Sequence, residues 1–483
     1  MTESLLNFID GAWRKPDTNR YLDVFEPATG QRYASVADSG ASDIEAAVCA
    51  ARAAFPAWSG LTHEARARWL HRLADAMEAE LDALANAETL DTGKPLWQTR
   101  DKEIPRAIGN FRFFAAAATQ FASESHHDVH LLNYTLRQPL GVVGCISPWN
   151  LPLLLLTWKI APALAAGNTV VAKPSEVTPL TAQRLCAILL RIGFPRGVLN
   201  IVHGNGASTG QSLVEHTQVK AISFTGSTAV GRQIAAYCGP ALKKVSLELG
   251  GKNPVLVFAD APRDALIETL LRSSFQNAGQ ICLCGSRILI ERAYYAEFRD
   301  AFVARAKSLM VGDPLRAETR IGALVSSAHQ AKVMNCIEQT KTDGGHILCG
   351  GDALSPEGRC ANGWFVQPTV VEGLDTHCRS NQEEIFGPVV SLQPFDDEAQ
   401  ALSMANASRY GLAAQIWTRD LMRAHRLAAR IETGIVWINC WMQRDLRTPF
   451  GGMKESGLGR EGGAEAMRFF TESRNVCVQI GET

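Results

Sequence analysis

The chain has 483 residues, 46% of them hydrophobic and 20% charged, an ordinary balance for a globular protein of two large or three smaller domains. Its formal net charge of −1 gives no reason to expect binding to nucleic acid or to an anionic membrane surface. The longest apolar run, residues 151–156, is far too short to span a bilayer, and residues 1–13 lack the basic-then-apolar pattern of a signal peptide.

The twelve cysteines are irregularly spaced and form no Cys-x-x-Cys pair, so neither a disulfide framework nor a metal site is expected. His126, His127 and His130 are better explained as residues of a polar loop than as metal ligands. We therefore expect no bound metal and a reducing compartment, the cytoplasm.

Short-range signals define the beginning of the chain. Asp10-Gly11 between two apolar stretches predicts a hairpin turn. Ser42 followed by Glu45 is the pattern of a capping box, which predicts a helix that Pro56 ends.

Two further helices and an extended segment follow. One helix is expected from about Thr62 to Asp91, with leucines along one face, and the next follows Pro105. Residues 126–140 are polar and lack a helical period, which predicts extended structure.

From Gly141 onward, strands alternate with helices. Buried-strand patterns occupy residues 142–147, 169–172, 198–202 and 221–224, and each precedes a helical segment. This alternation predicts a doubly wound parallel sheet, in which ligands bind at the carboxyl ends of the strands. A second alternating region runs from 254 to 439. The tail, 469–480, is predicted to be a strand that pairs with another element or another subunit.

Two cysteines lie in a glycine-containing loop between a helical run and a strand, at residues 275–287. A thiol on such a loop can be approached closely by a substrate, which makes Cys282 a candidate nucleophile. The alternative is that both are small packing residues, as most free cysteines are. Cys284 is better explained as a packing or redox neighbour.

Two polar residues end strands in the first alternating region. Asn150 has conformationally restricted neighbours, so its amide could serve an oxyanion hole, although for this segment alone a turn asparagine is the better explanation. Glu248 ends an apolar strand, where burial would raise its pKa as a general base requires. An exposed strand-end glutamate is the alternative.

The usual nucleotide motifs are missing. Gly204, Gly206 and Gly210 do not have the GxGxxG spacing, and residues 226–231 continue with Arg-Gln where a P-loop needs Lys and Ser/Thr. Gly226-Ser227 still lies between a strand and a helix, a suitable pyrophosphate site. Lys173 and Glu176 follow another strand and could hold ribose hydroxyls, with the acid disfavouring a 2′-phosphate.

Together these residues belong to seven motifs by which the chain resembles the aldehyde dehydrogenase superfamily over essentially its whole length. The motifs are Pro148-Trp149-Asn150, Lys173-Pro174-Ser175-Glu176, Phe224-Thr225-Gly226-Ser227, Leu247-Glu248-Leu249-Gly250-Gly251, Gly279-Gln280-Ile281-Cys282, Glu384-Ile385-Phe386-Gly387-Pro388 and Phe450-Gly451-Gly452. The resemblance implies an enzyme that oxidises an aldehyde to a carboxylic acid, with NAD as the expected cofactor and NADP not excluded.

The resemblance also implies the site residues. Cys282 would be the nucleophile, Glu248 the base, and Asn150 the oxyanion donor together with the main-chain N–H of Cys282. The cofactor residues would be Lys173 and Glu176 at the adenosine ribose, Trp149, Gly226 and Ser227 at the pyrophosphate, and Glu384 and Phe386 on the nicotinamide side.

The architecture implied is α/β in three parts. Residues 1–118 and 139–248 would form a doubly wound parallel-sheet NAD-binding domain, and 249–445 an α/β catalytic domain. Residues 119–138 and 466–483 would form a small β arm for oligomerisation, giving a homodimer or homotetramer.

The substrate pocket implied by the family is an apolar slot of Leu151, Leu154, Trp158, Ile281, Leu283, Trp441 and Phe450. Near it are Arg106 and Arg444, and a pair of arginines suits a substrate with a carboxylate at its far end. The alternative is ion pairing within the protein, for which Asp445 is a local partner.

These features are most similar to the branch of the family that oxidises muconic semialdehydes, which predicts 2-aminomuconate or 2-hydroxymuconate semialdehyde as the small-molecule substrate. The alternatives are a dehydrogenase for betaine aldehyde, an aminoaldehyde or an aliphatic aldehyde, and a non-catalytic NAD-binding protein. A CoA-acylating relative is disfavoured because Glu248 suits hydrolysis.

Overall fold

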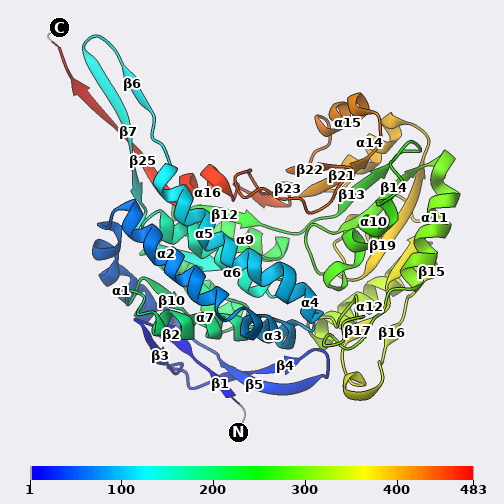
Figure 1. The fold of residues 1–483 in the computed structure, drawn as a ribbon, viewed down its shortest axis with the longest axis horizontal. Coiled ribbons are helices and arrows are strands. Elements are labelled where there is room, and N and C mark those ends of the chain that lie inside the picture. Colours follow the sequence, from blue (N-terminus) through cyan, green and yellow to red (C-terminus); the bar gives the residue numbers. More distant parts are fainter. Residues whose placement is uncertain (1–2, 482–483) are drawn as a thin grey trace.

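A computed structural model describes residues 3–481, and two large sheets with helices packed on both faces make up most of it (Figure 1). The first sheet has the strand order β24-β12-β11-β8-β9-β10-β2-β3. Its strands are β2 (Asn7–Ile9), β3 (Ala12–Arg14), β8 (Val142–Ile146), β9 (Thr169–Lys173), β10 (Leu199–Ile201), β11 (Val219–Thr225), β12 (Lys244–Glu248) and β24 (Gly457–Leu458).

The centre of this sheet, from β12 to β10, is parallel, as the alternating pattern predicted. Successive residues of β9 pack on opposite faces: Val170 and Ala172 in one apolar core, Val171 in another. The covering helices are α1 (Ala41–Ser59), α2 (His63–Glu78), α5 (Ile104–Gln120), α6 (Pro152–Ala165), α7 (Leu180–Arg191), α8 (Gln211–Glu215) and α9 (Thr228–Cys238). The doubly wound fold class is therefore confirmed.

The second sheet has the order β15-β18-β19-β14-β13-β21-β22, parallel except for the edge strand β15. Its strands are β13 (Asn253–Val257), β14 (Gly285–Glu291), β15 (His346–Cys349), β18 (Thr369–Glu372), β19 (Val389–Phe395), β21 (Ala413–Trp417) and β22 (Ile435–Ile438). Helices α10 (Leu266–Phe275), α11 (Arg292–Lys307), α12 (Ser327–Thr342), α14 (Glu398–Asn406) and α15 (Leu421–Ala428) accompany it.

A narrow three-stranded antiparallel sheet projects from the body at the upper left of Figure 1. Its strands are β6 (Ser125–His127), β7 (Leu131–Pro139) and β25 (Thr471–Gln479). The predicted tail strand therefore pairs within its own chain, from Thr471 opposite Pro139 to Gln479 opposite Leu131.

The remaining elements connect these parts. They are the small strands β1 (Glu3–Leu5), β4 (Tyr21–Glu26), β5 (Gln31–Ala37), β16 (Ala353–Leu354), β17 (Phe365–Val366), β20 (Tyr410–Gly411) and β23 (Met453–Lys454), and the helices α3 (Leu81–Thr92), α4 (Leu96–Gln98), α13 (Arg379–Gln382) and α16 (Gly463–Phe469). Short π-helical turns are η1 (Thr99–Glu103) and η2 (Gly206–Gly210), and short 3₁₀ turns are η3 (Gln276–Gly279) and η4 (Gly358–Cys360). No helix within 3–481 has the length and apolar composition to cross a membrane.

Two local predictions near the N-terminus were wrong. The N-cap of α1 is Gly40, whose N–H donates to the Asp43 carboxylate at 3.0 Å, so Ser42 and Glu45 do not form the cap. Pro56 lies inside the last turn of α1, where its missing N–H costs a single hydrogen bond and does not end the helix.

The helix predicted from Thr62 to Asp91 is two helices. Thr62 does cap α2, accepting from the Ala65 N–H at 3.2 Å, but α2 ends before Ala79 and a new helix, α3, begins at Leu81. The leucine pattern continues across the break because each of the two helices buries one apolar face.

Candidate active site

The carboxyl ends of β11 and β12 and the cysteine loop meet at a cavity of about 230 Å³. Seven of the residues predicted from the motifs line it: Trp149, Asn150, Gly226, Ser227, Cys282, Glu384 and Phe386. These residues lie in loops next to strands of both large sheets and are far apart in the sequence. The structure therefore gathers the predicted nucleophile, the oxyanion candidate and most of the cofactor candidates around one space.

The loop before Cys282 has an unusual backbone. Asn277, Ala278 and Gly279 all have left-handed φ angles, of 54°, 52° and 72°. A side chain on Gly279 would collide with the Gly387 carbonyl, so only glycine fits there. Left-handed conformations are costly for the other two and mark strain that surrounding contacts must hold in place.

The cysteine is held from the other side by Asn253. Its side-chain Nδ2 donates to the carbonyl oxygens of Cys282 at 2.7 Å and Cys284 at 2.8 Å. Cys282 is partly exposed, whereas Cys284 is buried in the apolar core. Among the described residues, no group accepts a hydrogen bond from the Cys282 N–H. That N–H is available to a ligand, and Cys284 has the environment of a packing residue.

The Cys282 thiol is not intrinsically acidic in this environment. Burial, then the Glu384 and Glu248 carboxylates, raise its pKa above the ordinary value for a thiol. The thiol is therefore predominantly protonated at neutral pH.

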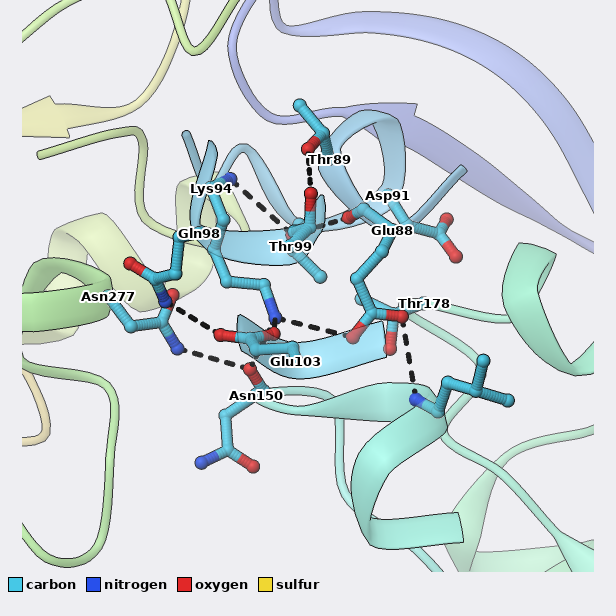
Figure 2. Close-up of polar contacts among 12 residues, drawn as sticks. Glu88, Thr89, Asp91, Lys94, Gln98, Thr99, Glu103, Asn150, Thr178 and Asn277 are labelled. Atoms are coloured by element: carbon cyan, nitrogen blue, oxygen red, sulfur yellow. Dashed lines mark hydrogen bonds and ion pairs between the residues drawn. The ribbon is translucent and has the colours of Figure 1, made fainter. Parts of the chain in front are cut away.

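The Asn150 side chain is fixed. Its Nδ2 donates to the Gln280 carbonyl at 2.9 Å, which leaves its second N–H free. The Asn150 main-chain oxygen accepts from the Asn277 side chain at 3.1 Å and from the Lys94 ammonium at 3.2 Å (Figure 2). Hydrogen bonds thus hold both the side chain and the main chain of Asn150, and the residue lines the same cavity as Cys282. The turn-asparagine alternative does not explain this arrangement.

Glu248 is buried, with 4% of its surface exposed, which removes the alternative of an exposed strand-end glutamate. Its Oε1 has no hydrogen-bond partner in the described part of the chain, and a Cβ on Gly451 would lie 2.7 Å from that oxygen. Burial and the nearby Glu461 carboxylate raise the pKa of Glu248 well above its usual value.

Sequence reasoning missed the charged neighbours of Glu248. The Glu461 carboxylate pairs with the Lys159 ammonium at 2.8 Å, and Ser223 Oγ lies 3.1 Å from both. Lys159 was not identified because it lies in the apolar helix α6, where a single lysine has no sequence signal for burial.

The cofactor candidates lie on the same edge of the first sheet. Ser227 caps α9, its Oγ accepting from the Val230 N–H at 3.4 Å, so the amino end of that helix faces the cavity. Lys173 Nζ pairs with Glu176 Oε2 at 2.8 Å at the end of β9. A phosphate at the helix end and a ribose at the lysine and acid fit this arrangement.

Glu384 and Phe386 complete the cavity. The Gly251 N–H donates to Glu384 Oε1 at 2.9 Å, and burial raises the Glu384 pKa to about 6. Phe386 has a φ of 60° and packs edge-on against Trp149, with ring centres 5.3 Å apart. Both side chains are thus held by specific contacts.

A second cavity, of about 690 Å³, contains the two predicted arginines. Arg106 and Arg444 line it together with Lys102, Arg272 and Trp441, and its lining includes no acidic residue. The Trp441 indole donates to the Leu283 carbonyl at 3.1 Å, which joins this cavity to the nucleophile loop.

The apolar residues predicted beside the arginines have a different place. The Arg444 guanidinium lies over the rings of Phe450 (4.1 Å) and Trp158 (5.0 Å), so these two support the arginine from behind. Leu151 is buried in the main core. None of the three lines the 690 Å³ cavity, whereas Trp441 does.

Asp445 does not neutralise Arg444. Its carboxylate instead binds Arg447, at 2.5 to 3.0 Å through several hydrogen bonds. Within the described residues, neither Arg106 nor Arg444 has an ion-pair partner, so the alternative of internal ion pairing is not what the structure shows.

Comparison with known proteins identifies the family of the chain. Residues 13–476 match the aldehyde dehydrogenase family. The chain is 48% identical to 2-aminomuconic semialdehyde dehydrogenase of Mus musculus, over 98% of each chain. It is 44% identical to 2-hydroxymuconic semialdehyde dehydrogenase of Pseudomonas sp. (strain CF600), over 99% of this chain and 100% of the relative. An aldehyde dehydrogenase of Bacillus cereus, solved as an NAD+ complex, superposes with a TM-score of 0.96 at 38% identity, covering 99% and 97% of the two chains.

Proposed function

The chain belongs to the aldehyde dehydrogenase family, and we propose that it oxidises a semialdehyde that carries a carboxylate far from its aldehyde group. NAD is the cofactor. The favoured substrates are 2-aminomuconate and 2-hydroxymuconate semialdehyde. Relatives of this chain carry these substrates in their names.

The observation that carries the proposal is the charge of the 690 Å³ cavity. Four cationic side chains line it, from Lys102, Arg106, Arg272 and Arg444, and no acidic side chain does. Unpaired arginines beside an apolar wall are suited to bidentate binding of a carboxylate.

Arg444 is the residue best placed to hold that carboxylate. Burial and the neighbouring Arg106 lower its pKa to about 10, so it stays charged at neutral pH. It is also among the charged groups that act on the pKa of Cys282, so the cation and the nucleophile share one electrostatic environment. A substrate that spans the two would present its aldehyde to the thiol.

The chemistry proposed for the site has three steps. The Cys282 thiol gives its proton to water and the sulfur attacks the aldehyde carbon. The resulting oxyanion is bound by the free N–H of Asn150 and by the Cys282 N–H. NAD, when bound, supplies the acceptor for the hydride that leaves the adduct, and a thioester remains on Cys282. Glu248 then takes a proton from water, whose oxygen attacks the thioester and releases the acid and the thiol.

The cofactor roles are proposed on the same basis. Lys173 and Glu176 would hold the adenosine ribose, Trp149, Gly226 and Ser227 the pyrophosphate, and Glu384 and Phe386 the nicotinamide side. The acid at 176 favours NAD over NADP.

The second candidate is a dehydrogenase for betaine aldehyde or another aminoaldehyde, and the cavity disfavours it. A cationic substrate would have to enter a space lined by four cations. A neutral aliphatic aldehyde would gain nothing from the unpaired arginines.

Assembly and location are proposed as well. The exposed arm of β6, β7 and β25 is suited to joining subunits, as a homodimer or homotetramer. All twelve cysteines are free thiols, as in a reducing compartment, and we propose the cytoplasm.

The test is the rate of NADH formation, by absorbance, with 2-hydroxymuconate, 2-aminomuconate and succinic semialdehydes, betaine aldehyde and a neutral aliphatic aldehyde. We expect the highest kcat/KM with a muconic semialdehyde, and no turnover by the Cys282→Ala variant, which should still bind NAD. A higher kcat/KM with betaine aldehyde would contradict the substrate proposal, and turnover by Cys282→Ala would contradict the role of the thiol.

A further inference from the structure

A buried ion cluster lies directly behind the oxyanion candidate (Figure 2). Lys94, in the turn after α3, has 1% of its side chain exposed. Its ammonium lies 3.4 Å from Glu88 of α3 and in close contact with Glu103 of η1. Burial lowers the pKa of Lys94, but attraction to these two carboxylates outweighs it and raises the pKa above its usual value. The lysine is therefore charged.

A buried ammonium is expensive, and pairing with the two carboxylates offsets that cost. The carboxylates have other donors: Glu103 accepts from the Gln98 amide at 2.7 Å, and Glu88 from the Leu153 N–H at 3.4 Å. What the lysine adds is a third contact, 3.2 Å from its Nζ to the main-chain oxygen of Asn150.

The cluster therefore forms hydrogen bonds with the main chain at two points of the turn that carries Asn150. Lys94 holds the carbonyl of residue 150, and Glu88 holds the N–H of residue 153, in the first turn of α6. A charge-assisted hydrogen bond is stronger than a neutral one, which suits it to fixing a main-chain position.

The same carbonyl connects to the strained nucleophile loop. Asn277 Nδ2 donates to the Asn150 oxygen at 3.1 Å and to the Gln280 oxygen at 3.3 Å, and Asn150 Nδ2 returns to the Gln280 oxygen at 2.9 Å. Three residues thus form a closed set of hydrogen bonds, and Lys94 joins it at the Asn150 carbonyl.

We propose that Lys94 is a positioning residue of the reaction: its ammonium sets the place of the Asn150 main chain, and through it the N–H that binds the oxyanion. This inference rests on the proposed role of Asn150. Lys94 does not line the cavity of Cys282 and acts on the reaction only through Asn150. The competing explanation is that the cluster only stabilises the fold.

A double-mutant cycle separates the positioning role from a purely structural one. The effects of mutating two residues are not additive when one residue acts through the other. The variant Lys94→Gln with Glu103→Gln removes one positive and one negative charge and keeps the buried balance. In the parent protein we expect its kcat to fall about 10- to 100-fold, the scale for misplacing a catalytic group by about an ångström. In an Asn150→Ala background, already slower by about 10²–10³-fold, the further loss should be less than about threefold.

The matched control is Arg66→Gln. Arg66 is another buried cation that donates to main-chain carbonyls, including that of Ala165 at 3.1 Å, at the far end of α6 from Asn150. Its effect on kcat should be the same in both backgrounds, and the NAD dissociation constant of the Lys94 variant should stay within about twofold of the parent, because no cofactor contact changes.

Equal losses of kcat in the two backgrounds, as for Arg66, would overturn the positioning role and leave the function of Asn150 intact. An Asn150→Ala variant with full activity would overturn both. If the double variant does not fold, as judged by thermal unfolding, Lys94→Arg takes its place, since it keeps the charge but moves the donor away from the Asn150 oxygen.

Discussion

Glu384 and Cys282 line the same cavity, and after burial the Glu384 carboxylate is the largest cause of the raised pKa of the Cys282 thiol. The acid proposed to orient the cofactor therefore also suppresses the thiolate. A thiol kept protonated until its ligands arrive is less exposed to oxidation and alkylation.

This relationship predicts the reactivity of Glu384→Gln. Removing the negative charge should lower the pKa of Cys282, so alkylation by iodoacetamide at pH 8 should be at least about threefold faster than in the parent. The pKa of Glu384 is about 6, so below that pH the parent carboxylate is protonated and the two rates should converge. The rate is measured by mass mapping of the Cys282 peptide; a constant ratio between pH 5 and 8 would contradict the prediction.

Glu248 and Glu461 make a second pH-dependent pair. Burial and then Glu461 raise the pKa of Glu248, so thioester hydrolysis should accelerate as pH rises and Glu248 ionises. Glu461→Gln removes the neighbouring negative charge, which should lower the pKa of Glu248. The rising limb of the plot of hydrolysis rate against pH should therefore move to lower pH. Single-turnover hydrolysis of the acyl-enzyme across pH 5 to 9 measures it; an unmoved limb would remove Glu461 as a cause.

Arg444→Ala should discriminate between substrates. We expect KM for a muconic semialdehyde to rise about 10- to 100-fold, the value of a hydrogen bond to a charged group, and KM for a neutral aldehyde to change far less. Arg447→Ala is the control, since Arg447 is paired with Asp445 and does not line the 690 Å³ cavity. Equal increases for both substrates after Arg444→Ala would remove the carboxylate argument.

Arg272 lies at the same cavity but is exposed, so its contribution should be long-range. Arg272→Glu should lower kcat/KM for the anionic substrate several-fold at about 10 mM salt, and much less at about 500 mM, where charges are screened. Lys220→Glu makes the same change in net charge at the amino end of β11, away from the site, and should have little effect. A salt-independent loss would show that Arg272 acts by contact.

The strands and the residues at their carboxyl ends could be predicted because buried parallel strands appear as short apolar runs. Glu248, Lys173 and Ser227 all follow such runs, and the structure places each at the same edge. Cys282 and Asn150 have no periodicity to identify them; their loop surroundings made them candidates, and the motifs gave them their roles.

The charges beneath the site could not be predicted. Lys94, Glu88 and Glu103 lie on or beside polar helical segments, where charged residues are ordinarily solvated, and only the packing of α3 and η1 against the Asn150 turn buries them. The left-handed run at Asn277 and Ala278 is likewise invisible, since alanine carries no preference for that conformation. Tertiary contacts determine both.

The pairing of β25 with β7 has a consequence for how the polypeptide is made. Residues 140–470 separate the two strands, so β7 has its partner β25 only after the ribosome has made all of these residues. Until then the short strand β6 is the sole neighbour of β7 in the described chain, and one edge of β7 stays unpaired. Completion of the arm thus requires synthesis to have passed residue 479, and a nascent chain that stalls before it carries an open β-edge for chaperones to recognise.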